Sequence, residues 1–171
     1  MDKYKLPKIG ARNLKTALAI FLSIIVLKLL GFDSSFYACI AAVICMGDSF
    51  ENSLKMGKNR MIGTLIGGCV GLFATFLLSY YSNFWFDTIL ITGLSIIVIY
   101  ICTLLNKPGS VSIACIVFLA NLLLTRDYSN YVYNISRIFE TLVGIVISII
   151  INIYIFPPKD AKDVKDKINL F

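Results

Sequence analysis

Two arginines in this sequence each begin the same short motif within an apolar stretch. Arg60 starts "RMIGTLIG" and Arg137 starts "RIFETLVG", so both motifs read Arg-x-x-x-Thr-Leu-x-Gly. A guanidinium inside a bilayer is costly unless it faces protein or water, which makes such an arginine a candidate for function. Its charge, together with the positive end of a helix, would attract an anion. Alternatively, both arginines extend to lipid phosphates and only set the depth of their helices.

Small or polar residues recur at every fourth position of the last apolar stretch: Glu140, Gly144, Ser148 and Asn152. On a helix this spacing places them on one face. Lipid satisfies neither a carboxylate nor an amide, so we expect this face to meet the protein interior or an aqueous path. Glu140 either neutralises Arg137 or takes up a proton. The predicted substrate-binding residues are Arg60, Thr64, Arg137, Glu140, Thr141 and Asn152.

A second set of residues is predicted to pack helices. Gly63, Gly67 and Gly71 follow one another at four-residue spacing, and Gly144 continues the pattern in the last stretch. Small residues at this spacing allow two helix backbones to approach closely within a membrane.

The composition determines the class of the protein. Hydrophobic residues make up 58% of the 171 residues and charged residues 15%, and the mean hydropathy is +0.82. Lipid must therefore be the solvent. We predict an all-α, polytopic membrane protein with one six-helix transmembrane domain over 1–158 and a short charged tail over 159–171. The expected helices are about 13–30, 34–47, 59–80, 86–105, 109–124 and 132–156, with Asp48 or Ser49 capping a helix start.

The two halves of the sequence resemble each other. "LSIIV" at 22–26 returns at 94–98, and "ACIAAVI" at 38–44 is answered by "ACIVFLA" at 114–120. Together with the arginine motifs, the matches keep their order. Each half holds three expected spans, so the second half enters the bilayer from the opposite face, which predicts a 3+3 inverted repeat. The short second and fifth spans occupy matching places, which is typical of a substrate path.

The basic residues indicate orientation. With six spans, one side receives all of the 16 lysines and arginines except Lys28, Arg126 and Arg137. The positive-inside rule then predicts a multi-pass plasma-membrane protein with both termini in the cytoplasm. No small-residue cleavage site follows the first apolar run, so we expect it to be retained as a helix. The net charge of +6 is thus an orientation signal, and we expect no nucleic-acid partner.

Several kinds of chemistry are disfavoured. The sequence contains no histidine, and its five cysteines lie in apolar stretches without CxxC spacing. We therefore predict no catalytic residues, no metal site, no cofactor and no enzyme, with the thiols buried as small packing residues.

Three segments resemble a known family: "IGARNLKTALA", "GKNRMIGTLIGGCVG" and "RIFETLVGIVISIIINIYIFPPK". Together they look like the aromatic acid exporter family, within the wider fusaric-acid-resistance-like (FUSC) membrane proteins, and the resemblance covers about 9–159. The most specific residues are Arg60, Gly63, Thr64 and Gly67, followed by the run from Arg137 to Pro158. The resemblance implies a six-helix bundle that exports aromatic or other organic carboxylates.

More distant relatives with a similar bundle include plant aluminium-activated malate transporters, which are dimeric anion channels. Many family members carry a cytoplasmic C-terminal domain or a second six-helix half. Because this sequence carries neither, the expected partners are a second copy in a homodimer or higher homo-oligomer, the lipid bilayer and an organic anion. The alternatives are an anion-channel-like pore and a non-transporting membrane scaffold or envelope-assembly protein.

Overall fold

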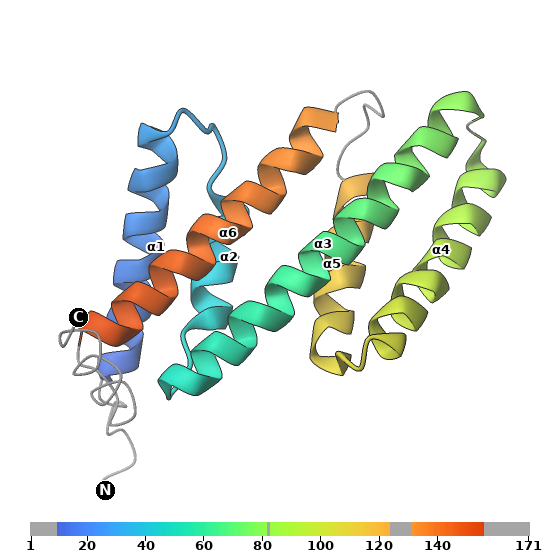
Figure 1. Cartoon of the computed structure of the whole chain (residues 1–171). Coiled ribbons are helices and arrows are strands. Elements are labelled where there is room, and N and C mark those ends of the chain that lie inside the picture. The colour runs from blue at the N-terminus through green and yellow to red at the C-terminus, as the bar shows by residue number, and fades with distance from the viewer. Residues whose placement is uncertain (1–9, 82, 124–130, 156–171) are drawn as a thin grey trace, which may run out of the picture. The chain divides into compact units, whose positions relative to one another are not determined.

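The computed structural model describes residues 10–81, 83–123 and 131–155, with side chains from residue 135 in the last range. Every regular element in these ranges is a helix, so the predicted all-α class is confirmed there (Figure 1). The expected tail over 159–171 lies outside the described residues. The elements are α1 (Ala11–Leu29), α2 (Phe36–Cys45), α3 (Phe50–Tyr80), α4 (Phe84–Leu104), the 3-10 helix η1 (Pro108–Ser110), α5 (Val111–Leu123) and α6 (Tyr131–Tyr154).

Three of these helices are long and apolar enough to cross a bilayer by themselves. They are α3, α4 and the Ile135–Tyr154 part of α6. The helix α2 and the stretch Pro108–Leu123 are apolar but shorter. The helix α1 is long enough but carries Arg12, Lys15 and Lys28 within its 19 residues. The described residues therefore establish a membrane protein with three candidate spans and shorter apolar helices, which is coarser than the predicted six-span arrangement.

Local chemistry sets the ends of the helices. The helix α3 begins at Phe50 rather than at residue 59, because the Ser49 hydroxyl accepts the backbone N–H of Asn52 at 3.1 Å and caps its first turn. The helix α1 ends where Gly31 adopts a φ of +82°, which favours glycine. The following N–H, of Phe32, then donates to the carbonyl of Leu27 at 3.0 Å, as in a Schellman motif.

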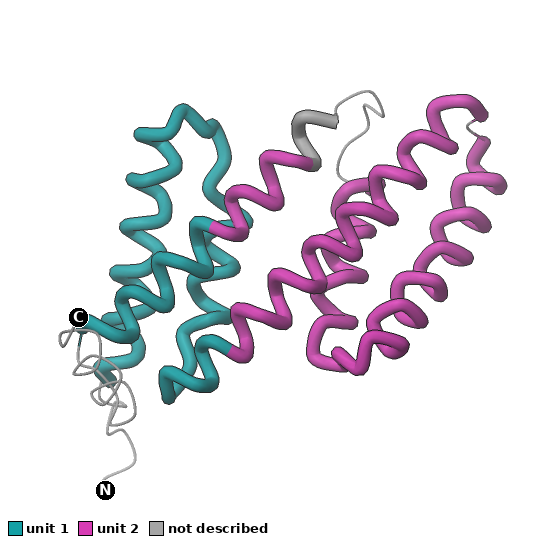
Figure 2. The backbone as a smooth tube through the Cα atoms, viewed as in Figure 1, with its two compact units in different colours: residues 1–54, 143–171 teal, residues 55–142 magenta. Residues whose placement is uncertain are grey.

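The chain forms two compact units (Figure 2). Unit 1 comprises residues 1–54 and 143–171, and therefore holds α1, α2, the start of α3 and the C-terminal part of α6. Unit 2 comprises residues 55–142 and holds most of α3, then α4, η1, α5 and the N-terminal part of α6.

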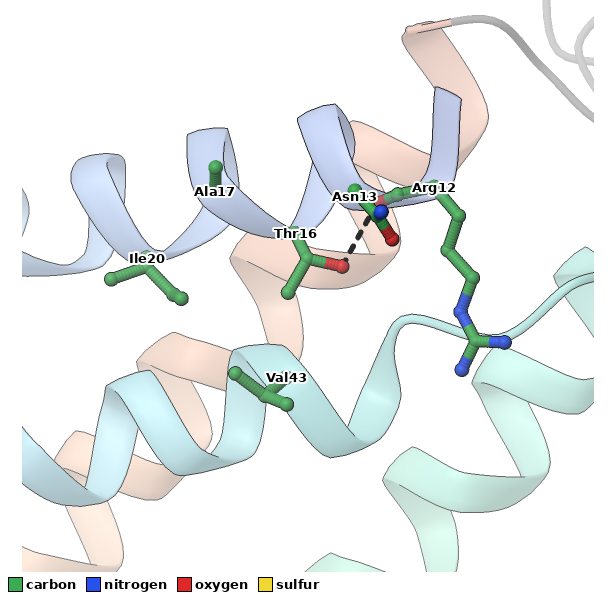
Figure 3. A pocket seen from close by; sticks show the side chains of 6 residues that line it. All are labelled: Arg12, Asn13, Thr16, Ala17, Ile20 and Val43. Atoms are coloured by element: carbon green, nitrogen blue, oxygen red, sulfur yellow. Dashed lines mark hydrogen bonds between the residues drawn. The ribbon is translucent and has the colours of Figure 1, made fainter. Parts of the chain in front are cut away.

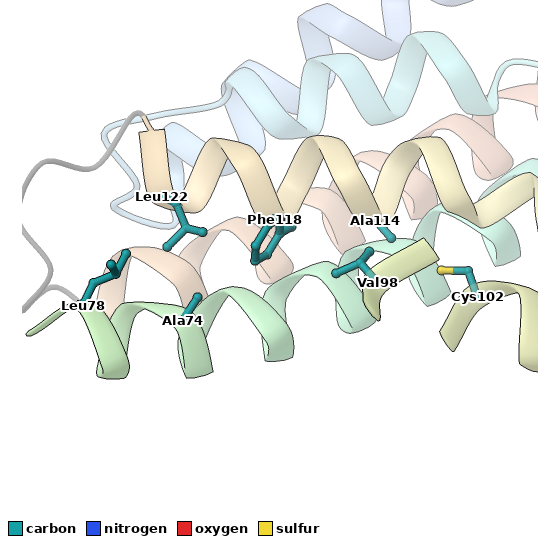
Figure 4. Packing of buried hydrophobic residues seen from close by; sticks show 7 residues of the cluster. All are labelled: Ala74, Leu78, Val98, Cys102, Ala114, Phe118 and Leu122. Atoms are coloured by element: carbon teal, nitrogen blue, oxygen red, sulfur yellow. The ribbon is translucent and has the colours of Figure 1, made fainter. Parts of the chain in front are cut away.

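The core of unit 2 is formed by three helices. Ala74 and Leu78 of α3, Val98 and Cys102 of α4, and Ala114, Phe118 and Leu122 of α5 are buried together (Figure 4). The opposite face of α4 remains apolar and uncovered, since only 11% of its spanning window is buried within the chain. An apolar face of this extent requires lipid or another apolar partner as its neighbour.

The core of unit 1 is smaller and also uses three helices. Ala19 of α1, Ala42 of α2 and Ile151 of α6 are buried together with Met46. Four partly buried residues surround them: Leu18, Leu22, Ile147 and Ile155.

The two cores correspond position by position. A shift of 72 carries Leu18, Ala19 and Leu22 onto Leu90, Ile91 and Leu94. Adding 76 to the residue numbers of Ala42 and Met46 of unit 1 gives Phe118 and Leu122 of unit 2. Subtracting 77 from those of Ile147, Ile151 and Ile155 gives Val70, Ala74 and Leu78. Every residue of the unit 1 core group therefore has its counterpart in the unit 2 core group.

The cysteines divide between the interior and the surface. Cys45 and Cys102 are buried, Cys39 and Cys115 are half-buried, and Cys69 is exposed on α3. The expectation of buried thiols is therefore wrong for Cys69, because its face of α3 is apolar but not covered by another helix of unit 2. Apolar sequence alone does not distinguish a face toward protein from a face toward lipid.

Candidate functional site

The polar residues predicted on α6 are buried in the protein. Arg137 is 1% exposed, Glu140 is 4% exposed and Asn152 is 1% exposed, and Thr141 and Ser148 are buried as well. They share one face because residues three and four apart lie on the same side of a helix. This is the face that the sequence predicts to point away from lipid.

The arginine of α3 has a similar environment. Arg60 is 5% exposed and Thr64, one turn later, is 1% exposed. Burial of both arginines argues against the alternative in which they extend outward to lipid phosphates. A buried guanidinium requires protein or water around it.

A buried amide on α5 orients the arginine of α6. Arg137 donates from Nη1 to Oδ1 of Asn121 at 3.0 Å, and Asn121 is 2% exposed. The same amide also packs on α3, because a Cβ added at Gly71 would lie 2.9 Å from its Nδ2. Asn121 thus connects three helices of unit 2. The sequence analysis did not include it in the site, although a lone asparagine in an apolar stretch is a signal for one.

The glycines of α3 bring two backbones together. A Cβ added at Gly63 would lie 2.7 Å from the carbonyl oxygen of Ser110, and one added at Gly67 would collide with the carbonyl oxygen of Ala114. In unit 1, a Cβ added at Gly144 would collide with the carbonyl oxygen of Ala38. Gly63, Gly67 and Gly144 therefore lie where the chain approaches another backbone closely, which places α3 and α6 against α5 and α2, whereas Gly71 meets the side chain of Asn121.

Two buried hydroxyls near these contacts have no hydrogen-bond partner among the residues that the structure describes. They are Oγ1 of Thr64 and Oγ of Ser110, and Ser110 is fully buried. Thr64 belongs to the predicted site, whereas Ser110 does not. Because a buried polar atom without a partner carries a desolvation cost, such atoms mark places where water or a ligand group can bind.

Asn152 belongs to a different group of side chains, in unit 1. Its Oδ1 accepts from Nζ of Lys15 at 2.9 Å, and its Nδ2 donates to Oγ of Ser53 at 2.7 Å. Longer contacts of 3.4 Å lead to the carbonyls of Gly47 and Ser49. The amide is thus used to connect α1, α6 and the start of α3. The predicted site residues therefore divide between the two units: Asn152 belongs to unit 1, and unit 2 holds Arg60, Thr64, Arg137, Glu140 and Thr141.

The buried charges of unit 2 are predominantly positive. Among the described residues of this unit, the buried arginine, lysine, aspartate or glutamate side chains are Arg60, Arg137 and Glu140. Buried basic side chains thus outnumber buried acidic ones in this unit, and electrostatic interactions in such an interior are stronger than in water. Such an interior favours an anion over a cation. Within the described ranges, no group of three histidine, cysteine or acidic residues could hold a metal ion.

Two of the cavities formed by the described residues are lined by neither Arg60 nor Arg137. One of about 470 Å³ lies in unit 1, and Figure 3 shows its lining residues on α1 and α2. One of about 250 Å³ lies in unit 2 and is lined by Leu65, Ile66, Cys69, Val70 and Ile101. Since its lining is apolar, this second cavity offers no group that would select a charged ligand.

Comparisons with known proteins give a family and several relatives. Residues 7–155 match the family described as aromatic acid exporter family member 1. A UPF0421 protein of Staphylococcus haemolyticus is 28% identical over 169 residues, which cover 98% of this chain and 49% of that protein. A UPF0421 protein of Staphylococcus saprophyticus is 29% identical over 163 residues, which cover 95% of this chain and 47% of that protein. A UPF0421 protein of Staphylococcus aureus strain USA300 is 29% identical over 169 residues, which cover 98% of this chain and 49% of that protein. The chain therefore spans about half the length of these relatives.

Proposed function

Because the chain belongs to the aromatic acid exporter family, we propose that it exports aromatic or other organic carboxylate anions across the plasma membrane. Family membership confirms the resemblance predicted from the sequence, and the family is one of exporters rather than enzymes. The UPF0421 relatives carry a name that specifies no substrate, so the transport role comes from the family. The observation that carries the proposal is the burial of Arg60 and Arg137, at 5% and 1% exposure.

The arginines supply the attraction for a carboxylate. A guanidinium matches a carboxylate with two parallel N–H donors, and the bond from Arg137 to Asn121 fixes the direction of that group before a substrate arrives. The unpartnered hydroxyl of Thr64, one turn after Arg60, offers a further donor on α3. Glu140, one turn after Arg137, either offsets the charge of the arginine or carries a proton that couples transport.

The arrangement of the spans is part of the proposal. Six helices cross the bilayer as two inverted triplets, with both termini in the cytoplasm as the basic residues predict. Support comes from the correspondence of the two cores and from the two glycine contacts. Gly67 meets the carbonyl of Ala114 in "ACIVFLA", and Gly144 meets that of Ala38 in "ACIAAVI". The same contact is thus formed by corresponding residues of both halves.

The ends of α1 and α4 support the same repeat. Gly31 and Asn106 both have positive φ values, and the residue after each donates its N–H to a carbonyl five positions earlier, at 3.0 Å. Introduced cysteines at Ser34 and Lys107, in a background with the native cysteines replaced, test the inversion. Labelling from opposite sides of the membrane is expected, and labelling from the same side contradicts it.

A transport assay tests the function. Purified full-length protein is reconstituted into liposomes, and uptake of radiolabelled benzoate is compared with that of empty vesicles. We expect uptake with the wild type and its loss in Arg137→Ala. The matched control is Lys28→Ala, which removes a positive charge from an exposed position of α1, and should transport like the wild type. Circular dichroism and gel filtration establish that both variants remain folded.

Three outcomes distinguish this proposal from its alternatives. Uptake that saturates with benzoate concentration supports a carrier. Uptake that is linear in concentration and appears as single-channel current in a planar bilayer indicates an anion-channel-like pore. Uptake equal to that of empty vesicles across a panel of organic acids indicates a membrane scaffold. A homodimer, the expected assembly, is measured separately from the mass of the protein in detergent.

A further inference from the structure

The cavity of about 470 Å³ in unit 1 changes from polar to apolar along α1 (Figure 3). Its lining residues are Arg12, Asn13, Thr16, Ala17, Ile20 and Val43. All except Val43 of α2 come from the first half of α1, so that the charged end lies at the start of this helix and the apolar end lies deeper. At a rise of ~1.5 Å per residue, the lining from Arg12 to Ile20 extends for about 12 Å.

The polar end of this groove offers N–H donors. Arg12 donates from Nη1 to Oδ1 of Asp48 at 2.8 Å, and both side chains are exposed, at 58% and 77%. This bond engages one of the five N–H donors of a guanidinium, and exposed pairs of this kind hold their partners weakly. The side chain of Asn13 makes no hydrogen bond within the described residues. The hydroxyl of Thr16 is already used, because it donates to the carbonyl of Arg12 at 2.9 Å.

We propose that this groove binds an anionic phospholipid of the cytoplasmic leaflet. The phosphate lies at Arg12 and Asn13, and an acyl chain lies against Ala17, Ile20 and Val43. A soluble carboxylate would also match the N–H donors of Arg12 and Asn13. A phospholipid fits better, because its charged headgroup and its apolar acyl chain follow each other in the same order as the charged and apolar residues along α1. Basic pockets between membrane helices on the cytoplasmic side bind anionic headgroups in this way. The inference rests on the cytoplasmic placement of the α1 start in the proposed function.

Three substitutions separate the contributions to binding. Arg12→Gln removes the charge that attracts the phosphate. Asp48→Asn removes the carboxylate that competes for Arg12, and should therefore act in the opposite direction. Ala17→Trp fills the exposed groove without changing any charge. Lys28→Gln is the matched control, because it removes one exposed positive charge from the last turn of the same helix.

Native mass spectrometry of the purified full chain in non-ionic detergent measures the binding. The probes are phosphatidylglycerol and phosphatidylcholine with identical acyl chains. We expect the wild type to prefer phosphatidylglycerol, and Arg12→Gln to weaken its binding about fivefold, the effect of one basic residue near an anionic surface. Asp48→Asn should strengthen it by a similar factor, Ala17→Trp should weaken both lipids, and Lys28→Gln should change neither. Circular dichroism establishes that each variant is folded.

Three results would overturn the proposal. The first is equal binding of the two lipids by the wild type, and the second is an equal effect of Arg12→Gln and Lys28→Gln. The third is displacement of phosphatidylglycerol by benzoate, which would make the groove a site for soluble acids. Lipid binding is measured without transport, so the two proposals can fail independently. A negative uptake assay does not contradict lipid binding, and absent lipid binding does not contradict transport.

Discussion

The close contact of α3 with α5 at Gly67 predicts a loss of stability on substitution by alanine. A glycine of α4 provides the control. Gly67 of α3 packs on α5, and a Cβ at this position would collide with the carbonyl oxygen of Ala114. A backbone carbonyl cannot move aside as a flexible side chain can, so Gly67→Ala forces the two helices apart. Gly93 of α4 is the matched control, because a Cβ there has no heavy atom within 4 Å.

The magnitude follows from two opposing effects. Replacing glycine by alanine inside a helix is favourable by about 1 kcal/mol, and both variants gain this. Overpacking costs Gly67→Ala about 1–3 kcal/mol in addition. The free energies of unfolding of Gly67→Ala and Gly93→Ala should therefore differ by about 1–3 kcal/mol. For a chain of this size, 1 kcal/mol shifts Tm by roughly 2–4 °C, so the two variants should differ by about 2–12 °C.

Thermal unfolding of the detergent-purified protein, followed by circular dichroism at 222 nm, measures this difference. The wild type should lie near or above Gly67→Ala in Tm, and Gly93→Ala should lie at or above the wild type. Equal Tm values for Gly67→Ala and Gly93→Ala would refute the reasoning, because they would show that α3 and α5 do not approach closely at Gly67.

The remaining predictions concern the polar contacts of both units. Asn121→Ala should lower benzoate uptake, because it removes the amide that orients Arg137, and should also lower Tm, because it leaves a buried guanidinium without this acceptor; unchanged uptake by the folded variant would contradict the orienting role. Asn152→Ala should destabilise the chain by about 1–3 kcal/mol in thermal unfolding, since it leaves the buried ammonium of Lys15 without its acceptor. An unchanged Tm would show that water replaces the amide. Ser49→Ala should cost about 0.5–2 kcal/mol through loss of a helix cap, and Ser49→Asp should restore stability.

The sequence predicts the helices and their buried face because both follow from periodicity. The arginine of each motif and the polar residues of α6 lie at helical spacing, and the structure buries them. The residue types are sufficient for this prediction, because an ionised side chain in an apolar stretch has few places where its burial is tolerated.

The contacts of those residues could not be predicted in the same way. Lys15 looks like one more cation of a basic N-terminal segment, yet it is buried and donates to an amide 137 positions away in the chain. The partner of Arg137 on α5 is likewise set by tertiary packing. Periodicity identifies the face of a helix, but it carries no information on which distant helix meets that face.

The difference in charge between α1 and the other long helices likewise depends on contacts that periodicity does not predict. Three basic residues in 19 make α1 more polar than a typical span. The structure accounts for one of them, since Lys15 is 7% exposed and hydrogen-bonded within unit 1, whereas Arg12 is exposed at the start of the helix and pairs with Asp48. A charge that is satisfied by protein or lies at the membrane surface does not prevent a helix from spanning.

The correspondence of the two cores leads to a prediction about additivity. Gly67 packs on α5 in unit 2 and Gly144 packs on α2 in unit 1, so the atoms nearest to the two added Cβ positions belong to different helices. Effects of substitutions without shared partners usually add within about 0.3–0.5 kcal/mol. Gly144→Ala should therefore lower stability about as much as Gly67→Ala, and the double variant should lose the sum of both. A double variant no less stable than either single one would contradict the independence of the two contacts.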